Sequence, residues 1–411
     1  MAIARRVTPP GSGRLATALV LCALPLVPIA STGALAATNS GCPAAESLVS
    51  GTTFHRHTLA PGVVMTSGNA SDSRGTVNIH VLHVDLTSSN LSVRPLLHSL
   101  ANRQPLSTLA AGHSHLVAAA NTGYFDFRTG APTVPLIVGG SPEVLSTTHK
   151  SVVGFAGSGL AESGKVWLDG SVTAGSGHRA LVGLNEVNPK TGIAVYTHKW
   201  GSVAVPARGV VARPVVGGTL GAVEQSSGRG RWGGGSDLTV PSGGYLLVAT
   251  GSSATNWLTS RATGAKTSYT AKVTTSAAKP FAQAYGVGVE LVARAGEARS
   301  GFSCNSAGTK TPARTSIGFA KGGKRLVMAF VADHEGTDLH GLDNDQMSAL
   351  MVQLGVSQAY NFDGSGSTEL LAKLKGSGAL TLQNYPADGA ERPMPLGMGL
   401  FSHPVKHTHK H

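Results

Sequence analysis

Short apolar runs separated by glycine-rich turns fill the chain from residue 150 to residue 300. Runs of this length, bounded by turns, are typical of β-strands and leave little room for long helices. The composition agrees, because the 411 residues include 54 glycines and only 13% charged residues, too few for a coiled coil. We therefore expect a β-rich body, with strands that include Lys165–Leu168, Ile193–Tyr196, Val203–Val205 and Gly244–Ala249.

One clear helix is predicted near residues 343–354. Asp343 is a good N-cap, and Gln346, three residues later, completes a capping-box pattern. Four apolar side chains then follow at three- and four-residue spacing, and Gly355 is placed to end the helix.

Apolar runs at 325–332 and 356–362 flank this helix and are predicted to be strands. A strand–helix–strand unit presents its ligand chemistry at the C-terminal ends of the strands, where Asp333 and Asp363 stand. The sequence as a whole predicts an α+β fold, with mixed or antiparallel β-sheets and few helices in a single large catalytic domain.

The first 36 residues resemble a secretory signal. Three arginines precede an apolar stretch, Leu15–Ala30, and the small-residue pattern Ala34–Ala36 follows it. The stretch is shorter than a bilayer span, and no later segment is long and apolar enough for one. We therefore expect residues 1–36 to be cleaved, and the mature protein to be secreted without stable membrane insertion.

The rest of the chain divides into three parts. Residues 37–75 are rich in Ser, Thr and Gly and are predicted to be an N-terminal extension. Residues 76–402 form the expected catalytic domain, and residues 403–411 are a His-rich tail. Two cysteines remain after cleavage, Cys42 and Cys304, and an oxidising compartment favours one disulfide between them over two free thiols.

The formal net charge of +12 favours anionic partners. No run of Lys and Arg interleaved with aromatic residues occurs, so nucleic acid is not an expected partner. An acidic polymer of the cell wall or surface fits better.

The densest site signal is the segment Tyr360–Thr368, in which an apolar strand delivers Asp363 into a turn of alternating glycine and serine. Glycines let backbone N–H groups approach an anion, and the hydroxyls of Ser365, Ser367 and Thr368 are further donors. The turn therefore suits a phosphate group beside a carboxylate. It does not match the P-loop pattern, because no Gly-Lys-Ser/Thr follows.

Three other blocks place polar side chains at predicted strand ends: Asn121–Phe125, Arg314–Gly318 and Ala332–Gly336. With the Asp363 turn, in this order, they resemble the phosphodiester glycosidase family, and Glu391–Pro395 resembles its closing segment. The resemblance spans about residues 76–402. It departs at Thr122, where the family has glycine, and at His334-Glu335, where the family has Gly-Arg.

The resemblance implies a hydrolase that releases a sugar from a sugar 1-phosphodiester, with a phosphodiester-linked glycan of the wall or extracellular space as its partner. Arginines and N–H donors would stabilise the departing phosphate, and a carboxylate would act at the sugar carbon or on water. The expected catalytic residues are Asp363, Asp333 and His334. The expected substrate-binding residues are Asn121, Tyr124, Arg314, Thr315, Gly364, Ser365, Gly366, Ser367, Thr368 and Arg392.

Two other functions stay open at this point. No metal or other cofactor is expected, but acidic and histidine side chains crowd residues 333–345 and could hold a divalent cation in a metal-dependent phosphodiesterase. Those near the predicted helix start are also explained by the helix dipole. The basic surface alone would suit a non-catalytic binder of anionic glycans.

Overall fold

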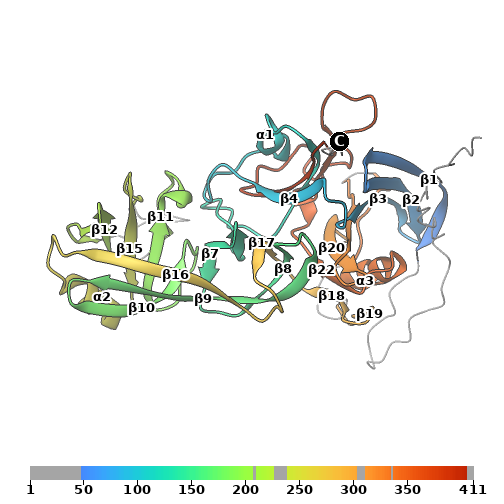
Figure 1. The fold of residues 1–411 in the computed structure, drawn as a ribbon. Helices are drawn as coiled ribbons and strands as arrows, with labels where there is room; N and C mark the ends of the chain where they lie inside the picture. The colour runs from blue at the N-terminus through green and yellow to red at the C-terminus, as the bar shows by residue number, and fades with distance from the viewer. Residues whose placement is uncertain (1–47, 207–209, 226–237, 303–310, 335–336, 405–411) are drawn as a thin grey trace, which may run out of the picture.

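The computed structural model describes residues 48–206, 210–225, 238–302, 311–334 and 337–404. Figure 1 shows three β-sheets with few helices. The helices are α1 (Leu106–Ala110), α2 (Ser252–Thr259) and α3 (Asn344–Gln353), with the 3-10 turns η1 (His198–Trp200) and η3 (Ser365–Ser367). The predicted α+β class, with largely antiparallel sheets, is confirmed.

The first sheet has eight strands. In spatial order they are β1 (Val49–Ala60), β2 (Val63–Asp72), β3 (Gly75–Asp85), β21 (Arg325–Val331), β20 (Arg314–Ala320), β22 (Gln358–Asn361), β18 (Glu290–Ala293) and β19 (Glu297–Ala298). From Val49 onward, the segment predicted to be an extension therefore contributes two strands to this sheet.

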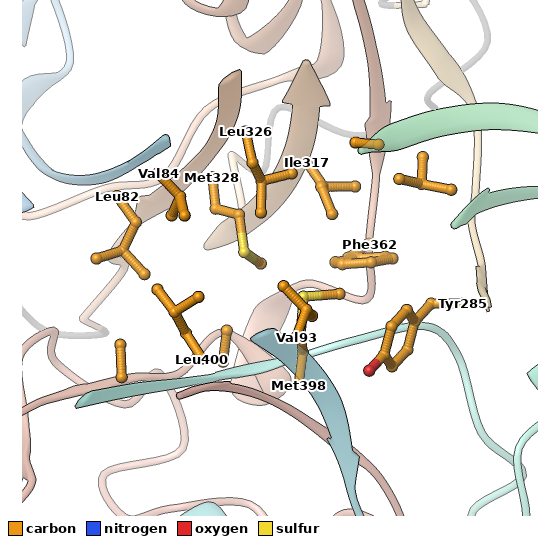
Figure 2. Packing of buried hydrophobic residues seen from close by; sticks show 14 of the residues in the cluster. Leu82, Val84, Val93, Tyr285, Ile317, Leu326, Met328, Phe362, Met398 and Leu400 are labelled. Atoms are coloured by element: carbon orange, nitrogen blue, oxygen red, sulfur yellow. The ribbon is translucent and has the colours of Figure 1, made fainter. Parts of the chain in front are cut away.

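The second sheet has five strands, in the order β24 (Thr381–Leu382), β23 (Leu370–Ala372), β5 (Leu116–Asn121), β25 (Gly397–Ser402) and β4 (Leu91–Leu96). It packs face to face on the eight-stranded sheet. Figure 2 shows Leu82, Val84 and Met328 of the first sheet against Val93, Met398 and Leu400 of the second. Burial of this apolar layer is the main force that holds the two sheets together.

The third sheet has twelve strands, and its outer part lies away from α3 in Figure 1. Its strands are β13 (Thr219–Leu220), β12 (Val211–Val216), β15 (Gly244–Thr250), β11 (Gly192–Thr197), β10 (Gly177–Leu184), β7 (Ser141–Ser146), β6 (Leu136–Val138), β17 (Phe281–Gly286), β8 (Lys150–Ala156), β9 (Ala161–Ala174), β16 (Thr267–Thr275) and β14 (Glu224–Gln225), which pairs with β12. The pairing of β10 with β11 is parallel.

The long strands of this third sheet have side chains that alternate between buried and exposed positions. In β9 the side chains of Val166, Leu168 and Val172 are buried, and the intervening positions are at least partly exposed. The strand predicted at Val203–Val205 is wrong, since these residues form an irregular segment after η1. Val205 is buried beside Trp200 there, so packing rather than sheet pairing explains its apolar character.

The predicted helix is confirmed as α3. The Asp343 side chain accepts a hydrogen bond from the Gln346 backbone N–H (2.7 Å), and the Gln346 side chain accepts one from the Asp343 N–H (3.2 Å). Met347, Leu350 and Met351 pack on the eight-stranded sheet. The flanking strands β21 and β22 both pair antiparallel with β20, which lies between them, so their C-terminal ends reach the same edge of the sheet.

Candidate active site

The predicted site residues meet at one edge of the eight-stranded sheet. Arg314 begins β20 opposite Val331, the last residue of β21, and Asp333 follows two residues later. Asp363 comes two residues after the end of β22. The end of β5, from the five-stranded sheet, joins them, because the Asp363 N–H donates to the Thr122 carbonyl (2.9 Å). Both stacked sheets therefore contribute to the site.

Asn121 ties these strand ends together. Its Nδ2 donates to the Asp363 carbonyl oxygen (2.7 Å), and its Oδ1 accepts from the Thr315 hydroxyl (2.8 Å). Asn121 is 1% exposed and Thr315 is fully buried. Their polar groups form hydrogen bonds inside the protein and hold Asp363 in position. The expectation that these two side chains contact the substrate stays a prediction.

The Gly-Ser turn holds the Asp363 carboxylate. Oδ1 accepts from the Gly364 N–H (3.1 Å), and Oδ2 accepts from the Ser367 hydroxyl (2.8 Å). Ser365 has the left-handed φ of 54°, which bends the chain back toward the carboxylate.

The turn is not the anion cradle that the sequence predicted. The N–H of Ser365 donates to the Ala313 carbonyl, that of Ser367 to Gly364, and that of Thr368 to Ser365. Thr368 is fully buried, and so is Ser367 apart from 1% of its surface. The N–H groups of Ser365, Ser367 and Thr368 therefore close the turn itself and do not face an anion.

Asp363 is half-buried, and its pKa reflects opposing effects. Burial raises the pKa above its ordinary value, and the hydrogen bonds from Ser367 and Gly364 and the charge of Arg392 lower it. Tyr124 lies near enough to feel both Asp363 and Arg314, and its hydroxyl accepts a hydrogen bond from Asn361 Nδ2 (3.3 Å). Burial raises the Tyr124 pKa, so this hydroxyl is a neutral donor beside the carboxylate.

Arg392 lies on the other side of the turn. Its guanidinium makes two hydrogen bonds to Asp388 (2.7 and 2.9 Å), and Nη1 donates to the Ser367 hydroxyl (3.3 Å). The Phe127 ring covers it at 5.3 Å. Asp388, which the sequence analysis missed, stands four residues before Arg392, and that spacing of opposite charges was the available signal.

The Arg314 guanidinium has N–H donors that form no hydrogen bond in the described part of the chain. Its Nε donates to the Leu342 carbonyl (2.9 Å), and its two terminal nitrogens have no hydrogen-bond partner in the described part of the chain. Burial lowers its pKa, and the neighbouring Tyr124 and Asp343 raise it. The guanidinium can therefore offer N–H groups to an anion.

Asp333 and His334 lie beyond the end of β21 and are half-buried. The His334 ring stacks on Tyr385 with 5.4 Å between ring centres. Of the other acidic and histidine residues in the proposed metal cluster, Glu335 is outside the described residues, Asp338 accepts from Thr76, and His340 pairs with Asp72. Within the described ranges, no group of three or more Cys, His, Asp or Glu side chains could hold a metal ion.

Glu369 is a further buried acid that the sequence analysis missed. It is fully buried, and one carboxylate oxygen accepts from the Arg392 backbone N–H (2.6 Å). Burial raises its pKa to about 8. It directly follows Thr368 in the predicted turn, but sequence alone gives no signal for burial of this carboxyl.

A cavity of about 420 Å³ lies apart from these residues. Its lining includes Phe319 and Gln358, which pair at the opposite end of β20 and β22 from the site. The predicted signal, Cys42, Cys304 and most of the His-rich tail lie outside the described residues. No described helix has the length and apolar character to cross a membrane.

Two solved structures share the fold. A hypothetical protein from Synechocystis is 19% identical, with a TM-score of 0.69, over 88% of this chain and 69% of its own. A Burkholderia pseudomallei protein whose name describes it as exported is 16% identical, with a TM-score of 0.61, over 81% and 76%.

The catalytic domain of zebrafish N-acetylglucosamine-1-phosphodiester alpha-N-acetylglucosaminidase, auto-inhibited by its pro-peptide, is 16% identical over 88% of this chain and 89% of its own, with a TM-score of 0.45. No curated protein matches the sequence. The phosphodiester glycosidase family matches residues 209–401, a range that contains Arg314, Asp363 and Arg392 but not Asn121 or Tyr124. The matched range is just under half of the chain, and it supports a hydrolase of the phosphodiester glycosidase type.

Proposed function

We propose that this protein hydrolyses a sugar 1-phosphodiester in a cell-wall or extracellular polysaccharide and releases the sugar from a phosphate monoester. One observation carries the proposal. A half-buried carboxylate, Asp363, is fixed by Ser367 and Gly364 within reach of the Arg392 charge, and Arg314 begins the neighbouring strand, all within the range that the phosphodiester glycosidase family matches.

The groups divide the reaction between them. Water attacks the anomeric carbon and gives its proton to Asp363. The bond between that carbon and the phosphate oxygen breaks, and its electron pair leaves with the phosphate monoester. Arg314, through its unpaired terminal nitrogens, and Arg392 stabilise the charge on the departing phosphate. Asp333 and His334, at the same sheet edge, support the sugar side of the reaction.

The proposed setting is outside the cell. The N-terminal segment has the pattern of a cleaved signal, and a disulfide between Cys42 and Cys304 suits an oxidising compartment. The basic charge favours an anionic glycan partner. The catalytic domain is proposed to run to residue 402 and to include the strands that precede residue 76.

The test is turnover of a panel of sugar 1-phosphodiesters in water labelled with oxygen-18, with and without a chelator. We expect label in the released sugar, because the carbon–oxygen bond breaks, and no effect of chelation. Asp363→Asn should lower kcat by about 10³–10⁴-fold with an unchanged unfolding midpoint.

Three outcomes would contradict the proposal. Label in the phosphate would mean attack at phosphorus. Chelator-sensitive turnover would favour the metal-dependent phosphodiesterase. Tight binding of an anionic glycan without turnover of any substrate would indicate a glycan-binding protein.

A further inference from the structure

Phe127 and Tyr385 have the most exposed large apolar side chains in the described ranges, at 60% and 59% exposure. A single exposed apolar residue is ordinary and requires no explanation. These two, however, both contact residues of the candidate active site, and they come from segments far apart in sequence.

Phe127 is held above the phosphate side of the site. Its ring lies 5.3 Å from the Arg392 guanidinium and 4.9 Å from the ring of Phe125, which is buried and anchors the segment. The intervening Asp126 accepts from the N–H groups of Arg128 (3.1 Å) and Thr129 (2.7 Å), which closes a tight turn. The ring is therefore exposed on a supported segment.

Tyr385 approaches the site through other neighbours. Its ring stacks on His334 with an interplanar angle of 27°. Its backbone is fixed by Asn384, whose Nδ2 donates both to the Tyr385 carbonyl (3.0 Å) and to the Thr368 carbonyl (2.8 Å) in the Gly-Ser turn. The Gly-Ser turn is thus joined to one exposed ring through Arg392 and to the other through Asn384.

We infer that Phe127 and Tyr385 are platforms for two sugar rings of the substrate, one on each side of the scissile phosphodiester. The inference rests on the proposed function. It adds the identity of the group on the other side of the phosphodiester, which is a second sugar. Sugar rings carry apolar C–H faces that pack against aromatic rings, and binding would remove from water the apolar surface that these side chains now expose. Arg392 and His334 cover part of each ring and keep it at the site.

The experiment compares Phe127→Ala and Tyr385→Ala with Val216→Ala, an exposed apolar position on β12 that is remote from the site. The substrates are a phosphodiester with a sugar on both sides and one with a methyl group beyond the phosphate. With the two-sugar substrate, each aromatic variant should raise KM about 5–30-fold and change kcat less than threefold. With the methyl substrate, only one of the two variants should still raise KM.

Binding measured without turnover separates this inference from the proposed function. Calorimetry with Asp363→Asn protein and the two-sugar substrate should give the same 5–30-fold weakening for each aromatic variant, and Tyr385→Phe should bind normally. Weakened binding in a protein that turns over nothing would support the platforms and overturn the proposed reaction. Normal turnover, with both aromatic variants indistinguishable from Val216→Ala, would overturn the platforms alone.

Discussion

Two arginines differ in how their donors are used: one is buried in the twelve-stranded sheet, and the other is half-buried at the candidate active site. Arg213, on β12, is 1% exposed, and each nitrogen of its guanidinium donates to the protein. Its acceptors include the carbonyls of Leu258 and Arg261 at the C-terminal end of α2, where the helix dipole is negative. Arg314 has one hydrogen bond, to a carbonyl, and keeps its terminal nitrogens unpaired in the described chain.

The comparison separates an arginine whose donors are all used within the protein from one with unused donors. Arg213 has no carboxylate partner in the described chain, so backbone carbonyls and the Thr263 hydroxyl offset the loss of its hydration. Such saturation locks β12 to the end of α2 and leaves nothing for a ligand. Arg314 is fixed by one bond to a carbonyl and can still bind an anion bidentately.

The largest expected effect is on the stability of the protein and tests the structural role of Arg213. Arg213→Leu should lower the free energy of unfolding by about 3–5 kcal/mol, because several buried carbonyls lose their donors. Denaturant unfolding followed by tryptophan fluorescence measures the loss. Material that stays folded should keep the wild-type kcat per folded molecule. A stable Arg213→Leu protein would mean that the carbonyls find other donors and that the arginine is dispensable.

Arg314→Lys tests the functional side and should have a smaller effect, on activity alone. The charge remains, but the planar fork that can grip a phosphate is lost, so kcat/KM should fall about 100-fold, or about 2.7 kcal/mol of transition-state stabilisation. The unfolding midpoint should stay unchanged. Arg325→Lys is the matched control, because Arg325 is a half-buried cation at the opposite end of β21 that donates to the carbonyls after α3. Equal loss of activity in Arg314→Lys and Arg325→Lys would mean that Arg314 has no special role in the reaction.

Glu369→Gln gives the smallest expected effect and extends the comparison to a buried acid. The folded state holds the Glu369 proton up to pH about 8, and the unfolded chain releases it near 4.5. Stability from this group is therefore greatest below pH 4.5 and falls as the pH rises from there through 8. Since glutamine stays neutral, the variant should match wild type at pH 4.5 and exceed its unfolding free energy by a growing margin as the pH rises to 8.

Unfolding curves at several pH values between 4.5 and 8.5 check this. Parallel stability profiles for the two proteins would show that Glu369 is ionised when folded. A variant destabilised at every pH would instead assign the carboxyl a hydrogen-bonding role that an amide cannot fill.

Local features were predictable from sequence and tertiary ones were not. The capping box at the start of α3 is formed by Asp343 and Gln346, which are three residues apart, so it can be recognised from the local sequence alone. The position of β20 between β21 and β22 depends on pairings across dozens of residues, and no local pattern encodes it. Arg213 gave no signal either, because its acceptors come from another segment.

The strand ends that carry Arg314, Asp333 and Asp363 meet at one sheet edge, as the placement of these residues at strand ends indicated. The surroundings of the candidate residues were less predictable. The N–H groups around Ser365 were expected to face an anion but close the turn instead. Asn121 is buried and donates to the Asp363 backbone carbonyl, and residue type alone does not reveal this burial.

Gly366 limits how this enzyme could be altered to accept another substrate. A Cβ atom at this position would lie 2.1 Å from Asp388 Oδ2 and 2.2 Å from Arg392 Nη2. A side chain at the centre of the turn therefore requires the Asp388 and Arg392 side chains to move, so substitution of Gly366 would disturb their ion pair. Phe127 and Tyr385 are exposed by contrast, and a library directed at those two positions would leave the Asp363 turn itself unchanged.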